Sequence, residues 1–150
     1  MSHLSGFDRL KQLALQRRDA RAQQLGTLVG EHTEAQAKLA LLYDYRRDYQ
    51  NRLDQATRAG IDGEGLRNFR SFLQQLDRAI AQQAEVTAEI WQRLKVVQQQ
   101  WIEDQRRVDS YQALDERRAD ASARRDQRHG QKLQDEFAAR MRVGVFGGDD

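Results

Sequence analysis

The chain of 150 residues contains no cysteine and no proline. Without cysteine it has neither a disulfide framework nor a thiolate zinc site, which fits a reducing cytoplasm. Without proline, whose ring clashes with the preceding turn and removes an N–H donor, a helix can continue for many turns. Hydrophobic residues make up only 39% of the chain and charged residues 32%. This composition is too poor in apolar residues for a thick globular core but sufficient for one narrow seam.

The sequence also lacks several motifs that mark membrane proteins, secreted proteins and enzymes. No run approaches the ~18 apolar residues of a membrane-spanning helix, and the first ten residues lack the pattern of a signal peptide, so we expect a cytoplasmic protein. Neither a GxxxxGK[ST] phosphate loop nor a GxSxG nucleophile motif occurs. His3, His32 and His129 are scattered and show no metal-ligand spacing. We therefore expect a protein that is not an enzyme and that binds neither a metal nor a cofactor.

The two signs of charge nearly balance, with 25 Lys and Arg against 23 Asp and Glu, and they alternate along the sequence. A nucleic-acid-binding protein more often carries a basic patch or stripe. We therefore expect protein partners and no nucleic acid. The abundance of arginine nevertheless leaves a nucleic-acid-binding coiled coil as an alternative, whose affinity would fall steeply with salt.

An interruption of the helix is predicted where Gly60, Gly63 and Gly65 follow one another closely. Each glycine in a helix interior destabilises the helix by roughly 1 kcal/mol relative to alanine. Asp62 is a suitable N-cap for a following helix. We predict a helix over about 7–57, a turn over 58–65 and a second helix over about 66–142. A flexible tail is expected at 143–150. All of these segments are assigned to a single coiled-coil domain, 1–150.

The second helix carries two interleaved series with a period of seven residues, and eleven of their fourteen positions are apolar. One series is Leu66, Leu73, Ile80, Thr87, Leu94, Trp101 and Val108; the other is Phe69, Leu76, Gln83, Ile90, Val97, Asp104 and Tyr111. Such heptads predict a coiled coil. The first helix has a matching stripe, which His32 and Arg46 interrupt: Leu25, Leu28, Ala35, Leu39, Leu42, Tyr49, Leu53 and Ala56. Before Leu25 this stripe weakens, leaving Phe7, Leu10, Leu13 and Ala14 as an N-terminal cluster.

Two striped helices joined by a short glycine turn are expected to fold back as an antiparallel hairpin. If the turn centres on Ile61, residues that face each other have numbers adding to about 122, as for Leu42 and Ile80. Phe7 then comes level with about Asp115. The segment 112–142 is nearly all charged, polar or alanine, and much of it is left without an intramolecular partner. It is either a solvated helix stabilised by charge pairs three and four residues apart, or a helix that becomes ordered inside a partner.

Near the turn the chain has more large apolar side chains than a two-helix seam can bury. Leu41, Tyr43 and Tyr45 flank the seam on the first helix, and Phe72 and Ala79 flank it on the second. Exposed clustered aromatics indicate an interaction site. The alternative is that the tyrosines only cover the seam and keep their hydroxyls in water.

Several motifs follow one another along the chain: Phe7-x-x-Leu10-x-x-Leu13, Leu39-x-x-Leu42-x-x-Tyr45-x-x-x-Tyr49, Phe72-x-x-x-Leu76-x-x-x-Ile80-x-x-Gln83, Trp101, and Asp135-Glu136-Phe137-Ala138. Their order and spacing resemble the FliJ family of the bacterial flagellar type III export apparatus. The equivalent small proteins of virulence injectisomes are similar in shape and remain an alternative. A plain structural or self-assembling coiled coil is a further alternative.

The resemblance implies an all-α, long antiparallel two-helix coiled coil like the γ stalk of rotary ATPases. It implies partners as well: the export ATPase FliI with its regulator FliH, whose ring the protein helps to assemble, the export gate protein FlhA, and export chaperones. It also implies a location at the cytoplasmic face of the inner membrane at the flagellar base, reached through protein partners alone. In this flagellar role the protein serves motility.

The resemblance assigns two sets of site residues by position. The export gate would bind Leu42, Tyr45, Tyr49, Phe72, Leu76 and Ala79. The ATPase ring would receive the paired chain ends, with contacts from Phe7, Leu10, Leu13, Tyr111, Arg117, Arg118, Arg124 and Arg125. One departure is Lys38, a charged residue one turn before Leu42, where the family pattern implies an uncharged polar one.

Overall fold

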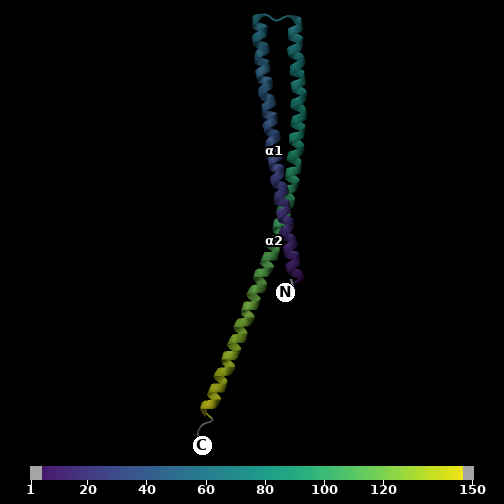
Figure 1. Ribbon diagram of the computed structural model, residues 1–150. Coiled ribbons are helices and arrows are strands. Elements are labelled where there is room, and N and C mark those ends of the chain that lie inside the picture. Colours follow the sequence, from purple (N-terminus) through teal and green to yellow (C-terminus); the bar gives the residue numbers. More distant parts are fainter. Residues whose placement is uncertain (1–4, 147–150) are drawn as a thin grey trace. The chain divides into compact units, whose positions relative to one another are not determined.

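A computed structural model describes residues 5–146 of the chain, and the side chains of residues 5–144. The described residues form two helices, α1 (Gly6–Ala59) and α2 (Gly63–Phe146). They run antiparallel and are joined at residues 60–62, which lie at the top of Figure 1. The predicted all-α helical hairpin is confirmed.

Both helices extend beyond the boundaries expected from the sequence. The turn is shorter than 58–65 because Asp62 caps α2 early: its carboxylate accepts a hydrogen bond from the Gly65 N–H at 2.8 Å. The predicted N-cap is thus confirmed, and α2 begins at Gly63. At the other end α2 continues to Phe146, so residues 143–146 of the expected tail are helical. Residues 147–150 lie outside the described residues.

Contacts between Cα atoms divide the chain into two units. One unit comprises Leu15–Gln105 and contains the turn; we call it the hairpin unit. The other combines the chain up to Ala14 with the chain from Arg106 onward; we call it the terminal unit. Each unit is described below by itself.

The seam of the hairpin unit follows the two heptad series predicted for the second helix. Within α2 its most enclosed residues are Leu73, Leu76, Ile80, Gln83, Thr87, Ile90, Leu94, Val97 and Asp104. On α1 the buried or half-buried positions include the whole predicted stripe from Leu25 to Ala56, together with the interrupting His32 and Arg46. A core cluster forms where Leu28 meets Leu94 and Val97. The sequence-based assignment of the seam in this unit is therefore confirmed.

Polar residues in the seam are matched to hydrogen-bond partners. The Gln83 side-chain amide donates to the Ala35 carbonyl of α1 at 3.2 Å, and the Thr87 hydroxyl donates to the Gln83 carbonyl at 2.8 Å. Arg46 occupies a seam position of α1, where most residues are apolar, and it pairs with Asp77 of α2. That hydrogen bond, with the charge of Asp77, raises the pKa of Arg46 above its usual value. These contacts satisfy the polar groups, so the heptad pattern continues across them.

The antiparallel register agrees with the predicted sum of about 122. In the hairpin unit the imidazole of His32 lies 5.1 Å from the ring of Trp91, and Arg21 donates to the side chain of Gln100 at 2.9 Å. In the terminal unit Phe7 meets Tyr111, with ring centroids 5.6 Å apart. The short turn thus sets which residues face each other along both helices.

Candidate partner-binding surfaces

The hairpin unit has two flanks, one on each side of its seam. A groove of about 710 Å³ is lined by Gln24 and Glu31 of α1 and by Arg93 of α2, among others. Tyr45 lies two heptads after Glu31, and Phe72 three heptads before Arg93. Residues separated by whole heptads lie on the same side of a helix in a coiled coil. Tyr45 and Phe72 therefore share one side of the unit, which we call the Phe72 flank.

The expected gate-binding residues divide between the seam and the Phe72 flank. Leu76 is a seam residue, only 8% exposed, and it supports the surface from beneath. Leu42, Tyr49 and Ala79 are half-buried. Tyr45 and Phe72 are the open members of the set, with 54% and 41% of their surfaces exposed. The part of this set that a partner can reach directly is thus centred on two aromatic side chains.

Tyr49 holds Phe72 in place. The ring centroid of Tyr49 lies 4.2 Å from that of Phe72 and 5.1 Å from that of Phe69. Aromatic contacts at such distances are favourable beyond the apolar area that they bury. Since Phe69 belongs to the half-buried seam, Phe72 is connected to the core through Tyr49 while part of its own surface stays exposed. A partner would therefore meet a side chain that is already ordered.

Tyr43 lies on the opposite side of the seam from Tyr45. It occupies the heptad position of Gln36, which lines a second groove of about 390 Å³ together with Ala84 and Trp91. We call this side the Trp91 flank. The aromatic surplus near the turn therefore consists of two separated surfaces, and Tyr43 belongs with Trp91.

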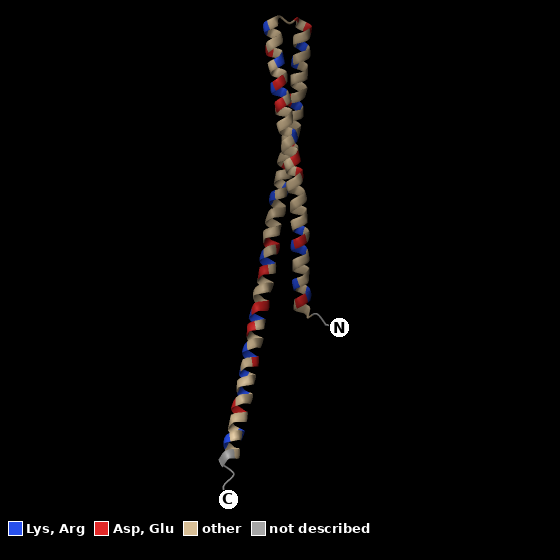
Figure 2. Ribbon diagram, turned by 60° about the vertical axis from the view of Figure 1, so that its left-hand side comes forward, with Lys and Arg blue, Asp and Glu red and all other residues tan. Residues whose placement is uncertain are grey.

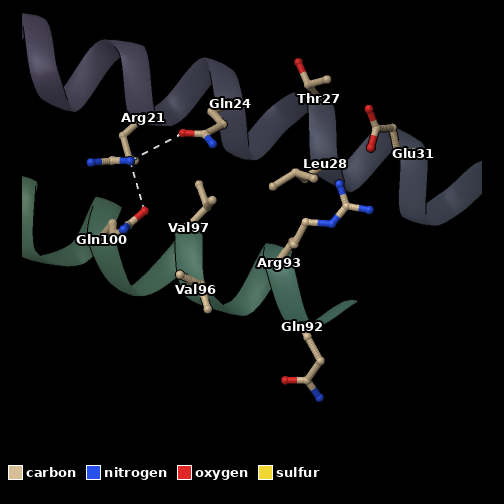
Figure 3. Close-up of a pocket in the computed structure, with 10 residues that line it drawn as sticks. All are labelled: Arg21, Gln24, Thr27, Leu28, Glu31, Gln92, Arg93, Val96, Val97 and Gln100. Carbon is tan, nitrogen blue, oxygen red and sulfur yellow. Dashed lines mark hydrogen bonds between the residues drawn. The ribbon is translucent and has the colours of Figure 1, made fainter. Parts of the chain in front are cut away.

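The groove on the Phe72 flank has a polar rim and an apolar floor (Figure 3). Leu28 and Val97 point between the helices, whereas Val96 and Gln92 point away from α1 (Figure 3). At one end Arg21 donates to Gln100 at 2.9 Å and to Gln24 at 3.5 Å. The groove follows the line where the two helices meet, and the hydrogen bond from Arg21 to Gln100 joins them at this end.

The terminal unit contains the residues expected to contact the ATPase ring. Phe7 and Tyr111 pack in a T-shaped arrangement, and the guanidinium of Arg118 lies 4.9 Å from the centre of the Phe7 ring. Lys11 forms an ion pair with Asp115. Phe7, Tyr111 and Arg118 are thus brought together into one aromatic and cationic cluster.

Other expected ring contacts lie outside that cluster. Leu10 and Leu13 are exposed, although the sequence grouped them with the apolar N-terminal residues Phe7 and Ala14. The seam here uses Lys11, not Leu10 or Leu13, because it keeps the heptad register set further along α1. Arg117, Arg124 and Arg125 are also exposed, as is every described side chain from residue 116 to residue 144.

The heptad pattern placed Asp104 in the seam but did not reveal its partner on α1. Asp104, 8% exposed, accepts a hydrogen bond from Arg21 at 3.3 Å, and both residues belong to the hairpin unit. The signal that could have found Arg21 is the register. Counting back one heptad from Leu28 reaches Arg21, which the sum of 122 places near Asp104. A cross-helix charge pair was therefore predictable.

Among the described residues no group of three or more His, Cys, Asp or Glu side chains is arranged to hold a metal ion. None of the described helices has a stretch long and apolar enough to span a bilayer.

Comparison with known proteins decides the family. The family model described as "Flagellar FliJ protein" matches residues 4–143. The chain belongs to the flagellar FliJ family. It is 32% identical over 131 residues to the flagellar FliJ protein of Escherichia coli strain K12, covering 87% of this chain and 89% of that protein. It is 29% identical over 140 residues to the flagellar FliJ protein of Salmonella typhi, covering 93% and 95%.

Membership of the FliJ family bears out the resemblance read from the motifs near the turn and near the chain ends. Because the family model matches residues 4–143, most of both units described above lies within the matched length.

Proposed function

We propose that this chain is a stalk-like component of the flagellar type III protein export apparatus. In this role it binds the export ATPase FliI with FliH, promotes assembly of the ATPase ring and couples that ring to the export gate protein FlhA. Handling of export chaperones is part of the same proposal. The protein sits at the cytoplasmic face of the inner membrane at the flagellar base, held there by protein partners. Family membership favours this flagellar role over an equivalent role in a virulence secretion system.

The exposed pair Tyr45 and Phe72 on one flank is the observation that best supports a gate-binding surface. Both side chains are large and apolar, and Phe72 is already ordered by its packing against Tyr49. An aromatic side chain fixed before binding loses little conformational entropy when a partner covers it. The surface lies in the hairpin unit, whereas Phe7, Tyr111 and the exposed arginines proposed for the ATPase lie in the terminal unit. Two partners can therefore be bound by two separate parts of the chain.

The experiment measures binding of purified variants to the cytoplasmic part of FlhA and to FliI. Tyr45→Ala and Phe72→Ala should weaken gate binding about ten-fold or more, as expected for aromatic anchors. Both variants should still co-purify with FliI, stimulate its ATPase rate and promote ring formation. Tyr43→Ala is the matched control, because it removes a similarly exposed tyrosine from the Trp91 flank.

Three results would contradict the proposal. If Tyr43→Ala weakened gate binding as much as Tyr45→Ala, the effect would not be specific to the Phe72 flank. If Phe72→Ala unfolded the hairpin, as judged by circular dichroism, Phe72 would be a core residue and not a contact. If the unmodified chain bound neither FliI nor FlhA, the stalk role itself would fail, leaving a structural coiled coil with an exposed patch.

A further inference from the structure

Residues 117–132 of the exposed part of α2 separate their charges by face, although the two signs alternate along the sequence. Figure 2 shows Lys and Arg, in blue, and Asp and Glu, in red, recurring along this part of the helix. At about 100° per residue, however, six basic residues lie within about 60° of one direction around the helix axis. We call them the basic face: Arg117, Arg118, Arg124, Arg125, Arg128 and Lys132.

The acidic residues just before and within this stretch point elsewhere, and Asp135 and Glu136, five turns after Arg117 and Arg118, mark the end of the basic face. Asp115, Glu116, Asp120 and Asp126 all lie about 100° or more from the centre of the basic face. The basic face itself extends over residues 117–132, which is roughly 22 Å of helix at 1.5 Å per residue. One side of the helix is thus cationic over about four turns, and the opposite side carries the carboxylates.

Local charge pairing does not explain this arrangement. Arg128 has Arg124 and Arg125 four and three residues before it, and Lys132 four residues after it. Like charges at these spacings destabilise a helix, whereas a helix stabilised by its own ion pairs would have an acid there. Arg125 likewise has no acidic residue three or four positions away. The centre of the basic face therefore carries positive charge that the helix does not neutralise itself.

The rest of the described chain does not neutralise it either. All six side chains are exposed, and the ion pairs found among the described residues involve none of them. Arg118 lies over the ring of Phe7, and Lys132 has Asp135 and Glu136 three and four residues after it. The centre of the basic face, at Arg125 and Arg128, is therefore free to meet an external anion.

The surroundings of the basic face discriminate between three kinds of anion. An anionic membrane would attract the basic side chains beside an apolar stripe, but the exposed Leu133, Phe137 and Met141 point away from the basic face. Double-stranded DNA presents phosphates on both sides of a bound helix, where Asp120 and Asp126 would meet them. A protein surface approaches from one side and avoids both conflicts.

A protein surface also suits the apolar residues within the basic face. Leu114, an exposed large apolar side chain, and Ala121 point in the same direction as the arginines. Protein interfaces combine arginine with apolar contacts, and guanidinium groups recognise carboxylates by paired hydrogen bonds.

We propose that the basic face of α2 binds a carboxylate-rich protein surface, contributed by Asp and Glu side chains along a strip about 22 Å long. This inference rests on the proposed function in one respect, which is that the export ATPase ring is expected to be the protein that carries this acidic strip. The required chemistry of the partner follows from the charges of this chain alone.

The test uses the full chain and defined polyanions. A fluorescent poly-L-glutamate chain, a 20-base-pair DNA duplex and phosphatidylglycerol vesicles are each titrated at low salt. Poly-L-glutamate should bind most tightly per unit charge. Arg125→Gln/Arg128→Gln should weaken that binding by about five-fold, since two charge contacts are removed. Arg70→Gln/Arg78→Gln is the matched control, because it removes the same net charge from exposed positions of the hairpin unit and should leave the affinity nearly unchanged.

Circular dichroism accompanies each titration. Gln supports a helix almost as well as Arg and relieves the repulsion around Arg128, so helicity should not fall. The proposal would be overturned if DNA or vesicles bound more tightly per unit charge than poly-L-glutamate. It would also be overturned if the two double variants weakened poly-L-glutamate binding equally.

Binding of FliI by the same variants distinguishes failure of this inference from failure of the proposed function. If FliI bound the unmodified chain and Arg125→Gln/Arg128→Gln equally well, the basic face would not be the contact, and the stalk role would stand. If the basic face bound poly-L-glutamate specifically but FliI did not bind, the face would have its predicted chemistry and the ring would not be its partner.

Discussion

At the scale of single residues, the seam tolerates polar side chains only where a partner has been supplied. Gln83 reaches the Ala35 carbonyl, and Asp104 accepts a hydrogen bond from Arg21. A buried polar group without a partner costs more than the bond itself is worth. The polar interruptions in the heptads are therefore not weak points so long as both members of each pair are present.

We predict that Asp104→Ala lowers the free energy of unfolding by about 1–2 kcal/mol, since it leaves the half-buried Arg21 without its carboxylate. Arg21→Leu/Asp104→Leu should restore stability to at least that of the unmodified chain, because it replaces the pair by apolar packing. Urea denaturation followed by circular dichroism measures both. An unchanged midpoint for Asp104→Ala would mean that water already solvates this pair.

The residue scale also shows where sequence reasoning worked and where it did not. The seam of α2 followed from its heptads because eleven of fourteen positions are apolar. The N-terminal end of α1 was assigned less well, because Leu10 and Leu13 are apolar but exposed. There the register outweighs composition, and Lys11 occupies the seam by pairing with Asp115. Its long aliphatic stem can pack against the helices while the ammonium group reaches the carboxylate.

At the scale of the element, the three glycines in and just after the turn have different structural roles. Gly60 has a φ of +91°, in the left-handed region that glycine adopts easily and that often ends a helix. At Gly65 a Cβ atom would come within 2.8 Å of the Asp62 carboxylate and 2.9 Å of the Ile61 side chain. Gly63 meets neither constraint, since a Cβ there would have nothing within 4 Å.

These differences predict opposite effects of alanine at two neighbouring glycines. Gly60→Ala should lower the free energy of unfolding by about 1 kcal/mol, because alanine is strained at positive φ. Gly63→Ala should raise it by about 0.5 kcal/mol, because it reduces the entropy of the unfolded chain without introducing strain. Thermal unfolding by circular dichroism compares the two variants. Equal destabilisation by both would show that residue 63 also needs a glycine conformation.

The boundaries of the elements were less predictable than their existence. Three glycines predicted a break, but the length of that break depended on the hydrogen bond from Gly65 to Asp62, which allows α2 to begin at Gly63. At the level of the candidate site, the sequence grouped Tyr43 with Tyr45. Their separation onto two flanks follows from the heptad positions once both helices are placed. The basic face of α2 was not recognised from the sequence for the same reason. Charges that alternate along a sequence do not have to alternate around the helix axis.

At the scale of the whole molecule, packing changes along α2. Between Leu73 and Val108 its seam residues are buried against α1 or lie at the helix interface. From residue 116 onward every described side chain is exposed, and most heptad positions are charged or small. Helices in water gain most of their stability from tertiary packing. The two parts of α2 should therefore differ in stability although both are helical.

Hydrogen–deuterium exchange measures this difference directly. We predict that backbone amides of residues 119–144 exchange at least about a hundred-fold faster than those of residues 73–97, because local opening of an unpacked helix disrupts no buried contacts. Poly-L-glutamate should slow exchange in residues 117–132 of the unmodified chain and not in Arg125→Gln/Arg128→Gln. Uniform protection along α2 would mean that the exposed segment is stabilised by itself, as a solvated helix. Rapid exchange that a carboxylate-bearing partner suppresses would instead identify a helix that becomes rigid only when its basic face is covered.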